Sequence, residues 1–166
     1  VTGVQTCALS IYTNSGINAS ALTTGRAPSS AMPAGSILQV VHTQLSTSFS
    51  GTSTQTGSGY YIDVTGLSAT ITPTSSTSKI LILTNMYIGS SAAGNSGYQQ
   101  SFRIKRNGTR VILGAGEGGR PTSTGRINMY TITTYGMQMF SGVHYDSPAS
   151  TSSLTYQIEL GGYSGD

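Results

Sequence analysis

The sequence predicts an all-β protein, an antiparallel β-sandwich of the jelly-roll kind preceded by a short extended stalk. Three observations lead to this fold class. No window of about eleven residues repeats apolar side chains at the helical spacing. Short runs in which apolar and polar residues alternate recur along the chain, as in half-buried strands. Segments rich in Gly, Ser and Asn separate these runs at short intervals, which is typical of sandwiches and barrels.

The first expected strands lie in the N-terminal half of the chain. Ser36–Phe49 has the composition of a long β run, and Tyr60–Val64 that of a short strand. Gly66–Pro73 alternates with period two, which predicts a half-buried antiparallel strand with Leu67, Ala69 and Ile71 on one side. Lys79–Ile88 starts with a continuous apolar run, so we expect it to be the central strand, buried on both faces.

The clearest local signal is a hairpin within Tyr98–Leu113. Phe102 and Ile104 alternate with polar neighbours, and Asn107-Gly108 follows. This pair predicts a two-residue turn, because both central positions need positive φ. A further paired strand region, broken near Gly136, is expected over 127–145. The last run predicts an inward set and an outward set: Leu154, Tyr156, Ile158 and Leu160 against Thr155, Gln157 and Glu159.

The two ends of the chain carry separate expectations. Val1 to Leu9, followed by Ile11, resembles the translation of a common sequencing adapter, with Ser10 where the adapter would encode proline. We therefore expect residues 1–12 to be an adapter-derived scar on a metagenomic fragment, so that Cys7 says nothing about redox compartment. Residues 13–35, rich in Gly, Ser, Ala and Pro, are expected to form a stalk or linker. Residues 36–166 would be the sandwich domain, truncated at its C-terminus.

The composition limits the classes of function. Charged residues make up 8% of the chain, against roughly 25% in an average soluble domain, and there are 10 Tyr and no Trp. A hydroxyl-rich, weakly charged surface suits extracellular adhesins, virion proteins and carbohydrate-facing surfaces. The net charge of +3 is small, so no nucleic-acid partner is expected. No apolar run approaches the roughly 18–20 residues of a membrane span, so no membrane insertion is expected.

Motifs for catalysis, metals or cofactors are weak. Gly114–Gly119 contains G-x-G-x-x-G, but Pro121 and a Ser/Thr/Gly run follow instead of a helix, which favours a plain loop. His42 and His144 lack the clustered spacing of zinc ligands, and the densest polar group is His144-Tyr145-Asp146. No G-x-S-x-G elbow is present, and the carboxylates are scattered. We expect no catalytic residues, no metal, no cofactor and no enzyme activity.

Most of the positive charge lies on or near the hairpin, and it has two interpretations. It could bind an anionic glycan, such as lipopolysaccharide phosphates or acidic sugars. The alternative, which we favour, is a solvated hairpin tip that keeps an edge strand from pairing with other molecules. Seven tyrosines offer flat rings that suit sugar stacking or subunit packing, although for any single one we favour a place in the core: Tyr60, Tyr61, Tyr87, Tyr98, Tyr130, Tyr135 and Tyr145. The candidate receptor- or glycan-binding residues are Arg103, Lys105, Arg106, Arg110, Arg120, Arg126 and Tyr145.

The order of segments resembles a known family. INASALTTGRAPSSAMPAGSILQVV is similar to the junction in bacteriophage tail-fibre proteins where a repetitive shaft ends and a β-domain begins. VTGLSATITPTSSTSKILIL, an R-N-G hairpin, a Gly-rich loop, an aromatic and Met-rich strand and SPASTSSLTYQIEL follow in the same order. The resemblance covers roughly Ile17 to Leu160, in pattern rather than in any catalytic motif.

This resemblance implies a virion structural protein in the distal part of a fibre, where it is a homotrimer and in some members binds the host receptor. Its partners would be a host cell-surface glycan or protein and other virion tail proteins. The loops expected to contact the host are Gly89–Gly97, Gly114–Gly125 and Tyr145–Ser153, because loops commonly carry function. Two alternatives remain open: a purely structural virion module without a ligand, and a carbohydrate-binding module of a secreted protein.

Overall fold

A computed structural model describes residues 32, 33, 35–51, 60–89, 98–114, 122–128 and 137–164. The expected scar and most of the expected stalk lie outside these residues. The chain divides into two compact units, Val1–Val40 and Val41–Asp166. In the first unit the Ser36 amide donates a hydrogen bond of 3.1 Å to the Pro33 carbonyl. All the strands named below belong to the second unit.

The second unit is built from antiparallel strands, and the described residues contain no helix. The predicted fold class, an all-β antiparallel sandwich, is therefore confirmed; its jelly-roll connectivity and its stalk stay predictions. The strands are β1 (Tyr60–Ile71), β2 (Ile80–Gly89), β3 (Tyr98–Arg106), β4 (Thr109–Val111), β5 (Gly125–Asn128), β6 (Met137–Asp146) and β7 (Leu154–Ser164).

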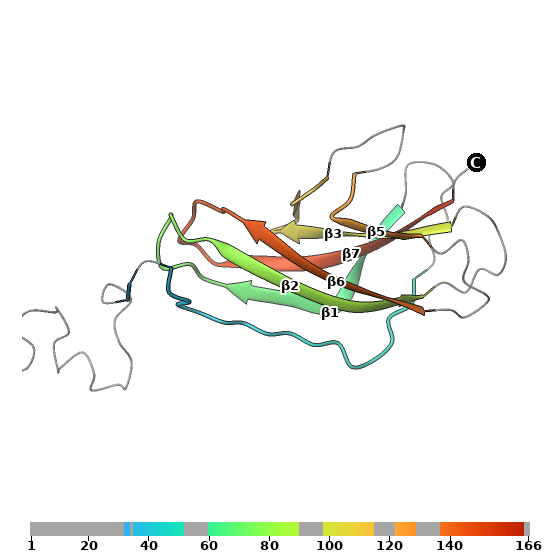
Figure 1. The fold of residues 1–166 in the computed structure, drawn as a ribbon, viewed down its shortest axis with the longest axis horizontal. Helices are drawn as coiled ribbons and strands as arrows, with labels where there is room; N and C mark the ends of the chain where they lie inside the picture. Colours follow the sequence, from blue (N-terminus) through green and yellow to red (C-terminus); the bar gives the residue numbers. More distant parts are fainter. Residues whose placement is uncertain are drawn as a thin grey trace, which may run out of the picture. The chain divides into compact units, whose positions relative to one another are not determined.

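Five of these strands form the larger sheet. β7 lies between β1 and β3 (Figure 1). β4 and β5 both pair with β3. β5 pairs with the first half of β3, at Gln99–Phe102, and β4 pairs with its last three residues. Between the two, the Thr124 amide donates to the Phe102 carbonyl and the Thr124 hydroxyl accepts from the Ile104 amide. Hydrogen bonding to β3 thus continues across the gap between β5 and β4.

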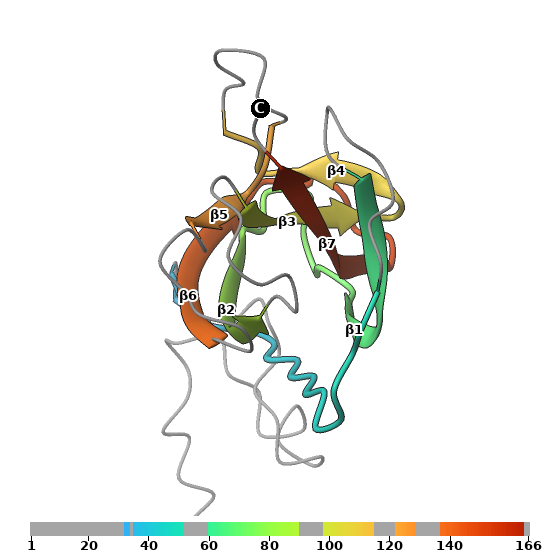
Figure 2. The same cartoon turned by 90° about the vertical axis from the view of Figure 1, so that its right-hand side faces the viewer.

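β2 and β6 form a second sheet of two strands, paired from Ile80↔Asp146 to Gly89↔Met137. It packs face to face on the larger sheet, and Figure 2 shows the two layers. The prediction that Lys79–Ile88 is a central strand buried on both faces is wrong, because among the described strands β2 pairs only with β6, and its side chains alternate between buried and exposed. The apolar run covers the core with one face only.

The core lies between the layers and centres on Phe102 and Ile104 of β3, which are fully buried. The Phe102 ring meets the Phe140 ring of β6 edge to face, with centroids 4.5 Å apart. Gly125 makes this contact possible, because a Cβ at that position would lie 2.4 Å from the Phe102 ring and 2.8 Å from the Phe140 ring. The inward set predicted for β7 is confirmed: Leu154, Tyr156, Ile158 and Leu160 all belong to or pack against the core.

β1 joins two segments that the sequence predicts as separate strands. Its register against β7 shifts between Asp63 and Ser68, and Gly66 has a φ of +86°. Such a bulge inserts unpaired residues without ending the strand, and glycine tolerates the positive φ. The Gln157 side chain donates to the Val64 carbonyl at 3.2 Å, which satisfies a backbone acceptor within the bulge. Gly66 therefore bends one long strand instead of separating two.

The predicted hairpin is confirmed. β3 and β4 pair from Arg106↔Thr109, and the two turn residues, Asn107 and Gly108, have φ values of +49° and +81°. Asn107 also joins the turn to β7, because its amide donates to the Thr155 carbonyl at 2.9 Å and its side-chain oxygen accepts from the Thr155 amide at 2.8 Å. The turn thus fixes the register of two strand pairs at once.

The long strand predicted over Ser36–Phe49 is wrong, since none of its residues belongs to a β-ladder. Within the second unit, Leu45 and Phe49 nevertheless pack against the core. A Cβ on Gly51 would lie 1.8 Å from Ile62 Cδ1, and a Cβ on Gly66 would lie 3.2 Å from Leu45 Cδ1. Within the second unit, residues 45–51 therefore lie beside β1 through their side chains, without ladder pairing among the described residues.

Candidate functional site

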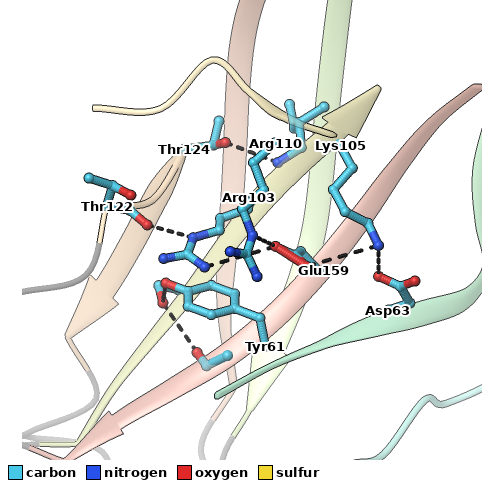
Figure 3. A network of polar contacts seen from close by, with 11 residues as sticks. Tyr61, Asp63, Arg103, Lys105, Arg110, Thr122, Thr124 and Glu159 are labelled. Atoms are coloured by element: carbon cyan, nitrogen blue, oxygen red, sulfur yellow. Dashed lines mark hydrogen bonds and ion pairs between the residues drawn. The ribbon is translucent and has the colours of Figure 1, made fainter. Parts of the chain in front are cut away.

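The larger sheet carries a charged cluster on the face that points away from the core. Because side chains alternate along a strand, Arg103 and Lys105 of β3 point opposite to Phe102 and Ile104. Register brings further polar residues to the same face: Lys105 is opposite Arg110, and Glu159 is opposite both Arg103 and Asp63. Figure 3 shows this group, which we call the outer-face cluster: Tyr61, Asp63, Arg103, Lys105, Arg110 and Glu159.

Arg103 is the most enclosed cation of the cluster, with 6% of its surface exposed. Its guanidinium carbon lies 3.5 Å from the centroid of the Tyr61 ring, in a cation–π stack, and its Nε donates to the Thr122 carbonyl at 2.6 Å. Burial lowers the pKa of Arg103, and the nearby charges of Arg110 and Arg126 act in the same direction. Arginine nonetheless stays protonated in proteins, so Arg103 contributes a buried positive charge.

Glu159 provides the central negative charge, although the sequence predicts it simply as outward-facing. It does face away from the core, but only 3% of its surface is exposed, because the cations around it cover it. Arg110 Nε donates to its carboxylate at 2.6 Å, and Arg103 and Lys105 each lie 4.0 Å from it. One buried carboxylate thus faces three cations, an arrangement in which the carboxylate compensates charge that would otherwise be unpaired.

The remaining members set the electrostatic balance of the cluster. The ammonium group of Lys105 donates to Asp63, whose side chain is half exposed. The hydroxyl of Tyr61 donates to Ser101 Oγ at 2.6 Å, since Ser101 itself donates to the Gly161 carbonyl. Three cations therefore meet two carboxylates, and Arg126 on neighbouring β5 adds a fourth positive charge. The face keeps an excess of positive charge, and Arg110, with 49% of its side chain exposed, is its most accessible cation.

Arg106 belongs to a different place. At the end of β3 it lies on the core side of the sheet, where its guanidinium donates to Asp146 of β6 at 2.7 Å. The Tyr156 hydroxyl of β7 donates to the same carboxylate oxygen at 2.6 Å. The hydrogen bond to Asp146 raises the pKa of Arg106, while burial and then this carboxylate raise the pKa of Tyr156. These three residues form an inter-sheet tie that joins the two layers at one end of the sandwich.

The structure separates the candidate residues that the sequence groups around one hairpin. Arg103, Lys105 and Arg110 belong to the outer-face cluster, whereas Arg106 belongs to the inter-sheet tie. Tyr145 lies on the other sheet, exposed on β6, where its ring is 6.0 Å from the ammonium group of Lys79. Arg126 donates to the Gln99 side chain at 3.1 Å beside the cluster. Arg120 and most of the Gly-rich loop 114–119 lie outside the described residues.

The polar group His144-Tyr145-Asp146 is divided between the two faces of β6. His144 and Asp146 point inward from β6 while Tyr145 points outward, so this dense sequence group does not converge on one point. His144 Nε2 lies 3.2 Å from the Thr84 hydroxyl and its ring 5.9 Å from that of Phe102, and burial lowers its pKa. Within the described ranges, no three His, Cys, Asp or Glu residues are placed to hold a metal ion.

Sequence reasoning missed Asp63 and Glu159 as members of the site, and it named Tyr61 only as one of seven tyrosines that could stack on a sugar. The alternation in LTYQIEL gives the direction of Glu159, but its partners depend on the register of β7 against β1 and β3. Comparisons with known protein families, with curated sequences and with solved structures found no match to this chain. The described residues also contain no helix long and apolar enough to span a membrane. The site therefore has to be interpreted from its own geometry.

Proposed function

We propose that this chain is a virion appendage domain of the bacteriophage tail-fibre type, which attaches to an acidic glycan on the host surface. The order of sequence segments from Ile17 to Leu160 supports the virion assignment. Assembly into a homotrimer and contact with other tail proteins are part of the same proposal. The action is binding rather than catalysis, and each weak contact is multiplied by the number of linked copies.

The observation that carries the glycan part of the proposal is the excess of positive charge beside an aromatic ring on the outer-face cluster. Arg110 is half exposed, and its guanidinium carbon lies 5.9 Å from the centroid of the Tyr61 ring. An aromatic ring packs on the apolar side of a sugar, while a guanidinium pairs with a carboxylate or phosphate. The buried Arg103–Glu159 pair beneath holds both groups in place.

A second candidate is a purely structural virion module. Its supporting observation is that Glu159 and Asp63 already pair with the cations of the cluster, so the site is internally satisfied. The two candidates differ in whether an added acidic ligand binds at Arg110.

A matched pair of charge substitutions separates these functions. Arg110→Gln and Lys79→Gln each remove one exposed positive charge, but Lys79 directly precedes β2 of the other sheet and is hydrogen-bonded to Ser147. Binding to immobilised lipopolysaccharide, with neutral dextran as the control surface, should fall at least about fivefold in Arg110→Gln and stay unchanged in Lys79→Gln. Equal losses would show that only the overall charge matters. A wild-type chain that binds neither surface favours the structural module.

A further inference from the structure

The outer side of the β2–β6 sheet is apolar, which is the reverse of the larger sheet. An antiparallel sheet with one face in water normally alternates apolar inward and polar outward side chains. β2 is largely apolar on both faces, and β6 is apolar mainly on its outer one. Seven large side chains on the outer side each keep between 57% and 72% of their surface exposed: Leu81, Leu83, Tyr87, Met137, Met139, Val143 and Tyr145. We call this set the apolar outer face.

The register makes this set continuous. Leu81 lies opposite Tyr145, Leu83 opposite Val143, and Tyr87 opposite Met139. Directly opposed side chains on one face of a sheet touch one another, so the patch runs along the whole ladder. Its only polar pair, Asn85 opposite Ser141, lies near the middle and is uncharged. The ten paired positions of the ladder place no charged side chain on this side of the sheet.

The area of the face matches a specific interface. At about 150–200 Å² for each large side chain, the exposed fractions correspond to roughly 700–900 Å². The largest apolar patch on a typical monomer is about 300–600 Å². A standard protein interface buries about 800 Å² on each partner. The apolar outer face is therefore larger than a monomer usually exposes, and it is large enough for a stable contact.

We propose that the apolar outer face is the surface through which one copy of this chain binds a second copy. Apart from Lys79 at its rim, 6.0 Å from the Tyr145 ring, the face is uncharged, so it offers little charge complement to a basic or acidic partner, whereas its apolar rows are complementary to a second copy. Two such sheets can pack at about 10 Å with interdigitating side chains, as in a sandwich core. Burial on both faces is then reached in the assembly, which accounts for the continuous apolar run of β2. A contact of this kind uses the same patch on both partners and closes at two copies, so this inference stands apart from the homotrimer of the proposed virion function.

Matched lysine substitutions test the contact. Leu83→Lys places a charge at the centre of the apolar outer face, and Ser68→Lys places one on the exposed outer side of β1. In sedimentation velocity, the wild type and Ser68→Lys should be assembled, while the dissociation constant of Leu83→Lys should rise about 100-fold or more. Circular dichroism checks that the variant is folded. A wild type that stays monomeric at about 100 µM overturns the inference and leaves this face to another protein.

A cross-link makes the test independent of any loss of folding. Asn85→Cys, in a Cys7→Ser background, puts a thiol at the middle of the face, and Ser68→Cys serves as the control. Mild oxidation should yield a covalent dimer of Asn85→Cys and none of Ser68→Cys. Assembled wild type with no Asn85→Cys dimer would place the contact elsewhere. Neither result depends on lipopolysaccharide binding. If the chain assembles but does not bind lipopolysaccharide, only the proposed attachment function is wrong. If the chain binds lipopolysaccharide but stays monomeric, only this inference is wrong.

Discussion

Replacing Glu159 with Gln removes the one buried negative charge among three cations while keeping the size of the side chain. Arg110 Nε lies 2.6 Å from this carboxylate, and Arg103 and Lys105 each lie 4.0 Å from it. Removing one partner of a buried pair costs about 3–5 kcal/mol, because the other charges remain buried without compensation. Arg110 is half exposed and Lys105 keeps Asp63, so we expect the lower end of that range, about 3 kcal/mol.

Urea unfolding followed by tyrosine fluorescence measures this loss. With a slope of about 2 kcal/mol per molar urea, the midpoint should fall by about 1.5 M at an unchanged slope. Asp63→Asn is the matched control, because it also removes a single carboxylate of the cluster. Its carboxylate is half exposed, so the cost should be no more than about 1 kcal/mol. If Glu159→Gln costs as little as Asp63→Asn, the cluster does not depend on a buried central charge and our account of it is wrong.

Three further predictions concern the core and the contact between layers. Asp146→Ala should lower the free energy of unfolding by about 2–3 kcal/mol, because Arg106 and Tyr156 both lose their acceptor, whereas Ser147→Ala should change little in the same urea titration. Gly125→Ala should cost about 1–3 kcal/mol by pushing the new methyl group into Phe102 and Phe140, and a thermal melt equal to wild type would contradict this packing. Burial lowers the pKa of His144 from the ordinary 6.5, so below pH 6.5 the unfolded chain takes up a proton that the folded chain does not. Stability should therefore fall from pH 7 towards pH 5.5, and His144→Gln should flatten this slope.

Local signals in the sequence were sufficient for the hairpin and for the direction of the core side chains. The turn at Asn107-Gly108 follows from the positive φ angles that these two residues adopt readily. Alternation of apolar and polar residues along the strand is enough to place Phe102 and Ile104 inward, without knowledge of the neighbouring strands. The outer-face cluster could not be predicted in this way. Arg103 and Glu159 are 56 positions apart in the numbering and meet only because β3 and β7 are neighbours with one particular register.

The apolar run of Lys79–Ile88 shows a different limit. Its composition calls for burial on both faces, and the sequence offered a central strand as the explanation. Among the strands that the structure describes, β2 has β6 as its one partner, and its outer side is exposed. The pattern of apolar side chains indicates how much of a strand's surface is apolar. It does not indicate whether the residues that bury this surface belong to the same chain.

The inter-sheet tie also determines how the sandwich can come apart. Arg106, Asp146 and Tyr156 hold β6 to the larger sheet at the Ile80↔Asp146 end of its ladder, whereas at the Gly89↔Met137 end the described polar contacts include no such bond. Segments that are held by fewer contacts open first in the fluctuations of the native state. Amide hydrogens at the Gly89 end should thus exchange before those beside Asp146. The two-stranded sheet would then separate from the larger sheet at its Gly89 end first, while the hydrogen bonds to the Asp146 carboxylate hold the other end.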